Sequence, residues 1–282
     1  MLDFPAARLS PFTAIDGENL ALYDWPLPEG SARRGTVLMV HGLGEHAGRY
    51  GHVAQHFNAW GFAVRAYDQY GHGRSGGPRG GLNHDARLLA DLADLVDATR
   101  KRMAPGEPLV LLGHSLGGLV AARLVSLNLR EVDGLVLSSP ALDAGMNPLQ
   151  KLLVSVLPRI APNLRVGNGL DPDMLSHVED VVQEYRKDPL VHDRISARLA
   201  RFIADAGPAV LAGVPQWRTP TLLMYAGADT LVNPAGSRAF AQAAPRSIVE
   251  SHHFESMYHE IFNEVDRETV FACLKSWLDA KF

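Results

Sequence analysis

The chain has 282 residues and a single cysteine, Cys273, so it has neither a disulfide framework nor a cysteine-based metal site. It also lacks any apolar run long enough to cross a membrane as a helix. Its 27 lysines and arginines do not exceed its 31 aspartates and glutamates, and the formal net charge of −4 gives no electrostatic basis for binding nucleic acid. Residues 1–5 have neither the basic start nor the apolar centre of a secretion signal, so we expect a cytoplasmic protein.

What the chain does contain is typical of a large globular domain. Hydrophobic residues make up 46% of the sequence and charged residues 21%, which are ordinary proportions. A chain of this length can bury about three quarters of its unfolded surface. We expect one domain over residues 1–282.

Apolar runs alternate with helical patterns through the first half of the chain. These runs are continuous, like strands buried on both faces of a parallel sheet, and they lie at residues 36–40, 62–67, 109–113 and 132–137. A hairpin at residues 9–27, which turns at Asp16 and Gly17, precedes them. The alternation predicts an α/β fold with a mostly parallel central sheet and helices on both faces.

The alternation stops at about residue 141 and resumes with the apolar run at 220–225. Between these points we find helical patterns interrupted by prolines and no convincing strand, which predicts a helical cap inserted at about 141–218. A helix at 149–161 has an apolar stripe at i, i+3, i+4 spacing. That stripe either packs onto the core or forms a tunnel wall or a patch that touches lipid surfaces.

The motif Gly113-x-Ser115-x-Gly117 stands between an apolar strand and a helical run. This is the context of a nucleophile elbow, in which a strained turn lifts the serine hydroxyl out of the sheet. The glycines remove side chains that would clash in the turn, and the new helix directs its N-terminus at the place where an oxyanion would form. The pentapeptide alone is equally compatible with an ordinary turn, so Ser115 is a candidate nucleophile that needs partners.

A serine nucleophile needs a base, and the base needs a group that fixes its tautomer. Ser115, Asp229 and His259 occur in the order serine, acid, histidine, each after a different predicted strand. Asp229 is favoured because it follows the carboxyl end of an apolar strand, and His259 because it lies in a loop past the last strand. Rivals for the two roles are Asp143, His252 and His253.

The loop at residues 41–44 supplies glycines after the first parallel strand. It fits the second half of an oxyanion hole, with the backbone N–H groups of Leu43 and Leu116 as donors. Gly42-x-Gly44-x-x-Ala47, with Asp68 at the end of the next strand, also fits a dinucleotide-binding fingerprint. That alternative is disfavoured because a hairpin precedes the strand, Glu45 would face the phosphates, and the triad residues would have no role.

Zinc is disfavoured for a similar reason. His259-Glu-Ile-Phe-Asn263 begins like the zinc motif His-Glu-x-x-His but lacks the second histidine.

Motifs along the whole chain resemble those of one family. They are His41-Gly-Leu-Gly-Glu-His46 with Gly48-Arg-Tyr50, Asp68-x-x-Gly-His-Gly-Arg-Ser75, Gly113-His-Ser-Leu-Gly-Gly118, Gly227-Ala-Asp229 with Val232, and Tyr258-His-Glu-Ile-Phe-Asn-Glu264. The chain resembles the monoacylglycerol lipase and lysophospholipase branch of the α/β-hydrolases, most weakly between 141 and 218.

The resemblance implies a catalytic triad, an oxyanion hole, a cap over an acyl-chain tunnel, and no cofactor or metal. The implied triad is Ser115, Asp229 and His259, and the oxyanion donors are the amides of Leu43 and Leu116. The implied substrates are monoacylglycerols and single-chain phospholipids. The cap would allow peripheral contact with a membrane or micelle.

We therefore expect ester hydrolysis through an acyl-enzyme. The same triad would also serve a small-ester carboxylesterase, a peptidase or a carbon–carbon bond hydrolase, since fold and triad do not separate these. A ligand-binding protein without catalysis is a further alternative, disfavoured because no triad member is missing. Acyl length, head group and oligomeric state stay open.

Overall fold

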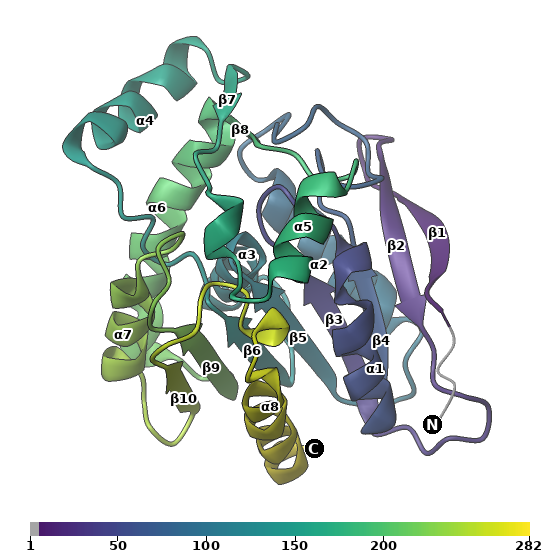
Figure 1. Ribbon diagram of the computed structural model, residues 1–282. Coiled ribbons are helices and arrows are strands. Elements are labelled where there is room, and N and C mark those ends of the chain that lie inside the picture. Colours follow the sequence, from purple (N-terminus) through teal and green to yellow (C-terminus); the bar gives the residue numbers. More distant parts are fainter. Residues whose placement is uncertain (1–5) are drawn as a thin grey trace.

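The computed structural model describes residues 6–282; residues 1–5, on which the expectation about a secretion signal rests, lie outside the described residues. One eight-stranded sheet forms the centre, in the order β1-β2-β4-β3-β5-β6-β9-β10 (Figure 1). Its strands are β1 (Arg8–Thr13), β2 (Asn19–Trp25), β3 (Gly35–Val40), β4 (Phe62–Tyr67), β5 (Leu109–His114), β6 (Gly134–Ser138), β9 (Thr221–Ala226) and β10 (Val249–Phe254). From β4 to β10 all neighbours are parallel, whereas β1 and β2 form the predicted hairpin and pair antiparallel.

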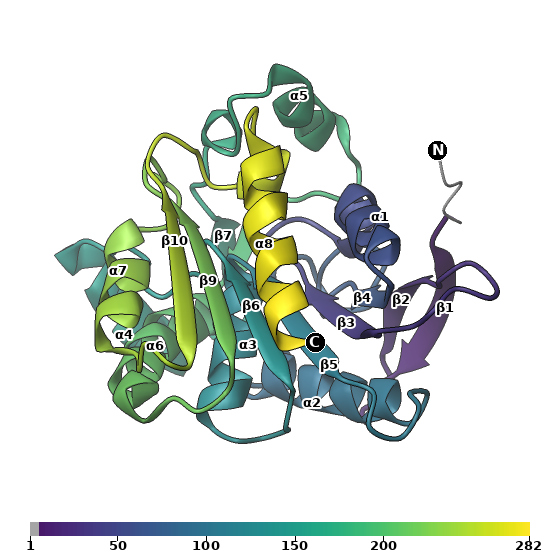
Figure 2. The same ribbon diagram turned by 90° about the horizontal axis from the view of Figure 1, so that it is seen from below.

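Helices cover both faces of this sheet, as predicted. The helices outside the insertion are α1 (Gly51–Ala59), α2 (Arg87–Arg100), α3 (Leu116–Ser126), α7 (Pro234–Ala243) and α8 (Arg267–Lys281). Figure 2 shows α1 and α8 on one face, where they enclose one of two apolar clusters, while α2, α3 and α7 enclose the other. Strand β3 contributes to both clusters, because successive side chains of a strand point to opposite faces of the sheet. Leu38 and Val40 belong to one cluster, and Val37 and Met39 belong to the other.

The segment between β6 and β9 is mostly helical, but the expectation that it contains no strand is wrong. Its elements are α4 (Pro148–Ile160), β7 (Arg165–Gly167), α5 (Glu179–Lys187), β8 (Arg194–Ser196) and α6 (Ala197–Gly213). β7 and β8 pair antiparallel. Each has only three residues, which are too few to show the apolar alternation by which a strand is recognised in a sequence.

Most prolines of this segment lie between its α-helices, as the sequence suggested, but two do not interrupt a helix. Pro158 lies inside α4 and Pro208 lies inside α6, and both helices continue through them.

Helix α4 projects from the body of the molecule and packs against α6 (Figure 1). None of its residues is buried. Leu149, Leu152 and Ile160 are 64%, 60% and 74% exposed, so the interpretation that the stripe packs onto the core is wrong. Among residues 6–282, no helix is both long and apolar enough to cross a bilayer.

Candidate active site

Ser115 lies in the turn between β5 and α3 with φ 53° and ψ −118°. A non-glycine residue at this φ stores strain of order 1–3 kcal/mol, so the surrounding structure must enforce it. The enforcement is visible, because the Ser115 N–H donates to the Ser138 carbonyl at 3.0 Å and its carbonyl accepts from Ala141 N at 3.0 Å. A side chain at Gly113 would collide with the Gly117 carbonyl. The sequence around Ser115 thus folds as the predicted elbow.

The loop after β3 lies against this turn. A Cβ on Gly42 would come within 3.2 Å of the Ser115 Cβ. Leu43, Ser115 and Leu116 share the wall of one cavity. Leu116 begins α3, whose first N–H groups have no partner within the helix. The structure therefore brings together the residues whose amides were predicted to form the oxyanion hole.

Asp229 and His259 form a buried pair. The His259 Nδ1 lies 2.6 Å from the Asp229 Oδ2, and their side chains are 5% and 3% exposed. The other Asp229 oxygen accepts hydrogen bonds from the N–H groups of Leu231 and Val232, each at 2.9 Å. Burial alone lowers the pKa of His259, but the Asp229 carboxylate outweighs it, and the pKa of His259 is raised.

This pair lies beside the elbow. The ring of His259 is 4.7 Å, between centroids, from that of His114, the residue before Ser115. In the described part of the chain the Ser115 hydroxyl makes no hydrogen bond with His259. Such contacts are often loose without a bound ligand and tighten when substrate binds.

The rival residues are engaged elsewhere. Asp143 accepts from Gly145 N at 2.9 Å and from the Asn233 amide at 2.7 Å. His252 contacts Glu250 and the Cys273 thiol, and His253 stacks on Tyr225; both histidines lie on β10.

Asp68 has a structural task that conflicts with binding a ribose. It is fully buried. One carboxylate oxygen accepts from Ala47 N at 2.8 Å, and the other accepts from Arg74 N at 2.7 Å and from the Tyr23 hydroxyl at 3.2 Å. Its hydrogen-bonding capacity is used to fix two loops, which removes the main support for a dinucleotide site. Residues 6–282 contain no group of three or more histidine, cysteine, aspartate or glutamate side chains that could hold a metal ion.

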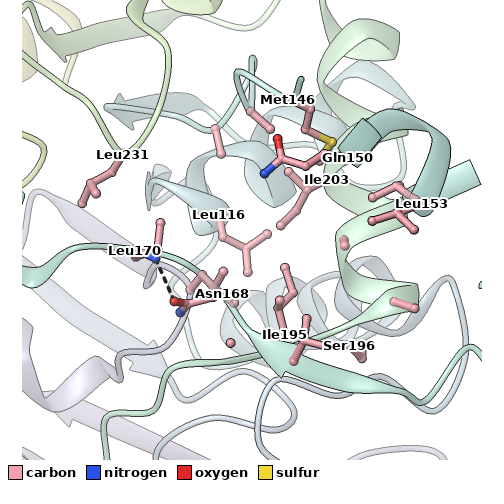
Figure 3. A pocket seen from close by; sticks show the side chains of 18 of the residues that line it. Leu116, Met146, Gln150, Leu153, Asn168, Leu170, Ile195, Ser196, Ile203 and Leu231 are labelled. Carbon is pink, nitrogen blue, oxygen red and sulfur yellow. Dashed lines mark hydrogen bonds between the residues drawn. The ribbon is translucent and has the colours of Figure 1, made fainter. Parts of the chain in front are cut away.

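A cavity of about 300 Å³ opens at Ser115. Figure 3 shows Leu116 from α3, Ile195 from β8 and Ile203 from α6 around the same space. Most of its wall comes from the inserted segment, including Leu153 and Leu157 on the inner side of α4. Asn168 is one of few polar residues in the wall, and its Oδ1 accepts a hydrogen bond from Leu170 N at 3.0 Å. The cavity is therefore suited to an apolar ligand next to the serine.

Sequence reasoning missed a buried ion network next to the site. Arg49 contacts both Glu45 and Glu260, and the Arg49 guanidinium lies over the Tyr185 ring at 4.9 Å. Burial raises the pKa of Glu45, but Arg49 outweighs it, so the pKa lies below its ordinary value and the carboxylate stays charged. The i, i+4 spacing of Glu45 and Arg49 was the one local sign of an ion pair in the sequence. The contact with Glu260 could not be predicted, because Glu260 lies 211 residues from Arg49.

The sheet order, the elbow and the insertion after β6 define the class: this is an α/β-hydrolase. Residues 31–266 match the family described as "Serine aminopeptidase, S33". The chain is 35% identical over 270 residues to the monoacylglycerol lipase of Mycolicibacterium smegmatis, covering 95% of each. It is 31% identical over 249 residues to phospholipase YtpA of Bacillus subtilis, covering 86% of this chain and 95% of that one.

The crystal structure of Paleococcus ferrophilus monoacylglycerol lipase superposes with a TM-score of 0.83 at 36% identity, covering 93% of this chain and 99% of that chain. The chain belongs to the serine aminopeptidase S33 family of α/β-hydrolases, and its predicted resemblance to the monoacylglycerol lipase branch is confirmed.

Proposed function

We propose that this protein hydrolyses carboxylic esters of single-chain lipids, most directly monoacylglycerols, with Ser115, Asp229 and His259 as its catalytic triad. The observation that carries the proposal is the position of Ser115 at an apolar cavity, beside a buried aspartate–histidine pair. Family membership together with the monoacylglycerol lipase relatives makes the protein an ester hydrolase. The named activities of the relatives, lipase and phospholipase, support a lipid ester as substrate.

The proposed reaction passes through an acyl-enzyme on Ser115. His259 Nε2 takes the proton of the Ser115 hydroxyl as its oxygen attacks the ester carbonyl carbon. The amides of Leu43 and Leu116 stabilise the negative oxygen of the tetrahedral intermediate. His259 then gives the proton to the leaving alcohol, and the acyl group stays on Ser115. Water, activated by His259, attacks the acyl carbon, and the fatty acid leaves as the serine regains its proton.

Asp229 supports these steps in two ways. Its carboxylate accepts a hydrogen bond from the Nδ1–H of His259, so the neutral ring has its lone pair on Nε2, where the serine proton is taken. It also stabilises the charged ring that forms during attack.

The wall of the cavity favours an acyl chain over a peptide or a small polar ester. Most of its side chains are apolar and cannot satisfy a peptide backbone, and an unpaired buried amide is costly. The alternative, a carboxylesterase of small esters, differs in acyl length and is separated by the experiment below.

The exposed apolar side of α4 suits contact with a lipid surface. Leu149, Leu152 and Ile160 are exposed on the same helix from which Leu153 and Leu157 line the cavity. Monomeric proteins rarely expose large contiguous apolar surface without a binding role. We propose that α4 touches the membrane or micelle from which the substrate enters.

The test compares wild type with Ser115→Ala on monoacylglycerol, lysophosphatidylcholine and p-nitrophenyl esters of short and long chains. We expect serine-dependent release of fatty acid from monoacylglycerol. The ratio to lysophosphatidylcholine gives the head-group preference. Activity confined to short esters would overturn the lipid assignment but keep the triad, whereas near-wild-type activity in Ser115→Ala would overturn the triad.

A further inference from the structure

One buried guanidinium connects two carboxylates that come from opposite ends of the sequence. Arg49 NH1 donates to Glu45 Oε2 and to Glu260 Oε1, both at 2.6 Å, and Arg49 NH2 donates to Glu260 Oε2 at 2.8 Å. The side chains of Arg49, Glu45 and Glu260 are 12%, 4% and 5% exposed. The Arg49–Glu260 contact is bidentate, so it fixes orientation as well as distance.

Through Glu45, this network holds the loop after β3, which contains the proposed oxyanion-hole residue Leu43. The Glu45 Oε1 accepts from the Gly42 N–H at 2.6 Å and from the Tyr50 hydroxyl at 2.7 Å. Gly42 immediately precedes Leu43, so a shift of the Glu45 carboxylate would move the peptide that carries the Leu43 amide. Arg49 occupies the remaining oxygen of Glu45 and restrains it.

Through Glu260, the network holds the loop of the catalytic base. Glu260 follows His259 directly, and its backbone N–H donates to the Leu175 carbonyl at 2.8 Å. Its carboxylate receives Arg49 and also the Asn263 amide at 2.6 Å. The residue next to the imidazole is therefore anchored through both its backbone and its side chain.

We propose that Arg49 is a positioning residue, which sets the Leu43 amide and the His259 imidazole relative to Ser115 by clamping Glu45 and Glu260. The inference rests on the proposed function, since it gives Arg49 the task of positioning groups of the proposed triad and oxyanion hole. Arg49 would touch no reacting atom.

A purely stabilising role accounts poorly for this arrangement. Buried ion groups are weak contributors to stability compared with apolar residues of similar volume. Here two carboxylates share one cation, which leaves a net negative charge beside His259. Arg49, Glu45 and Glu260 instead supply directional hydrogen bonds between the loop after β3 and the loop of His259, which no backbone hydrogen bond within residues 6–282 joins.

The test uses Arg49→Met, Arg49→Lys and Glu260→Gln, with Arg65→Lys as the matched control. Arg65 makes a bidentate contact with Asp24 at 2.7 and 3.0 Å, its side chain is 5% exposed, and neither residue lines the cavity. The rate of hydrolysis of p-nitrophenyl butyrate is measured for each variant. It is divided by the fraction of protein labelled by a fluorophosphonate, which bonds to the active serine with loss of fluoride, so that misfolded protein is not counted.

We expect Arg49→Met to lower kcat by about 10²-fold with little change in KM, because small displacements of reacting groups cost rates of this size. Arg49→Lys should fall between Arg49→Met and wild type, since lysine keeps the charge but not the fork. Arg65→Lys should change the thermal midpoint more than kcat.

The pH profile gives a second signature. Asp229, Glu45 and Glu260 raise the pKa of His259, and the His114 ring lies against it. Glu260→Gln removes an anion, so the acid limb of kcat/KM should move to lower pH. Arg49→Lys keeps a cation between the carboxylates, so its acid limb should stay closer to that of wild type than the limb of Glu260→Gln does.

Equal kcat values and equal pH profiles for the Arg49 variants, Glu260→Gln and Arg65→Lys would overturn the inference and leave Arg49 as a structural ion pair. Ser115→Ala is measured in the same series. If it retains activity or labelling, the proposed function itself has failed; if it is inactive while the Arg49 variants match the control, the inference alone has failed.

Discussion

Replacement of Asp229 by asparagine changes one group of the proposed triad with almost no change in size. One Asp229 oxygen accepts two backbone N–H groups, from Leu231 and Val232, so the asparagine carbonyl must take that position. Its NH₂ group then faces His259 Nδ1, where the carboxylate stood at 2.6 Å. A donor on that side forces the imidazole proton onto Nε2, and the ring can no longer accept the proton of Ser115.

The expected loss is about 10⁴-fold in kcat, the size seen when the same change is made in another serine hydrolase. At 1.36 kcal/mol per decade this is about 5 kcal/mol of transition-state stabilisation. Initial rates with p-nitrophenyl butyrate, normalised to the concentration of folded protein from circular dichroism, measure it.

Asp143→Asn is the matched control for Asp229→Asn. Asp143 is the rival acid in the sequence, but its oxygens bind Gly145 N and the Asn233 amide rather than a histidine. We expect kcat within about twofold of wild type, as for a surface substitution. A loss of less than about tenfold in Asp229→Asn, or a larger loss in Asp143→Asn than in Asp229→Asn, would refute the assignment of the acid.

Further predictions concern pH, backbone packing and lipid contact. Because the pKa of His259 is raised above 6.5 and the base must be neutral, kcat/KM should fall as pH drops through a value above 6.5, in a profile measured with a short ester. Gly117→Ala would place a methyl group against a β3 carbonyl and should lower the free energy of unfolding by about 1–3 kcal/mol. Gly51→Ala, in open space within α1, should instead raise the free energy of unfolding by up to about 1 kcal/mol. Thermal melts of both variants measure the two changes. Leu149→Ser combined with Leu152→Ser should reduce hydrolysis of monoacylglycerol in vesicles but not of soluble p-nitrophenyl butyrate; equal loss on both would contradict contact with lipid through α4.

Features governed by neighbours in sequence could be predicted without the fold. The parallel strands were recognised because each is a continuous apolar run, which is required when both faces of a strand are buried. The Ser115 elbow was recognised because its steric demands fall on Gly113 and Gly117, two residues away on either side. Here the local pattern and the physical constraint act over the same few residues.

The short pair β7 and β8 could not be predicted in this way. Each strand has only three residues, so no apolar alternation distinguishes it from a loop. Nor could the partner of the α4 stripe be predicted, because periodicity shows that a helix has an apolar side but not what that side meets.

The sequence by itself determined the α/β class, the elbow and the candidate triad, since each depends on apolar runs or on residue types at short, fixed spacing. Only the tertiary structure decided that Asp229 rather than Asp143 binds His259, that Asp68 is occupied by two loops, and that Arg49 clamps Glu260, which lies 211 residues away. These are contacts between side chains on different strands and loops. Their partners are chosen by where the sheet order brings the strand ends together, which no local pattern of residues specifies.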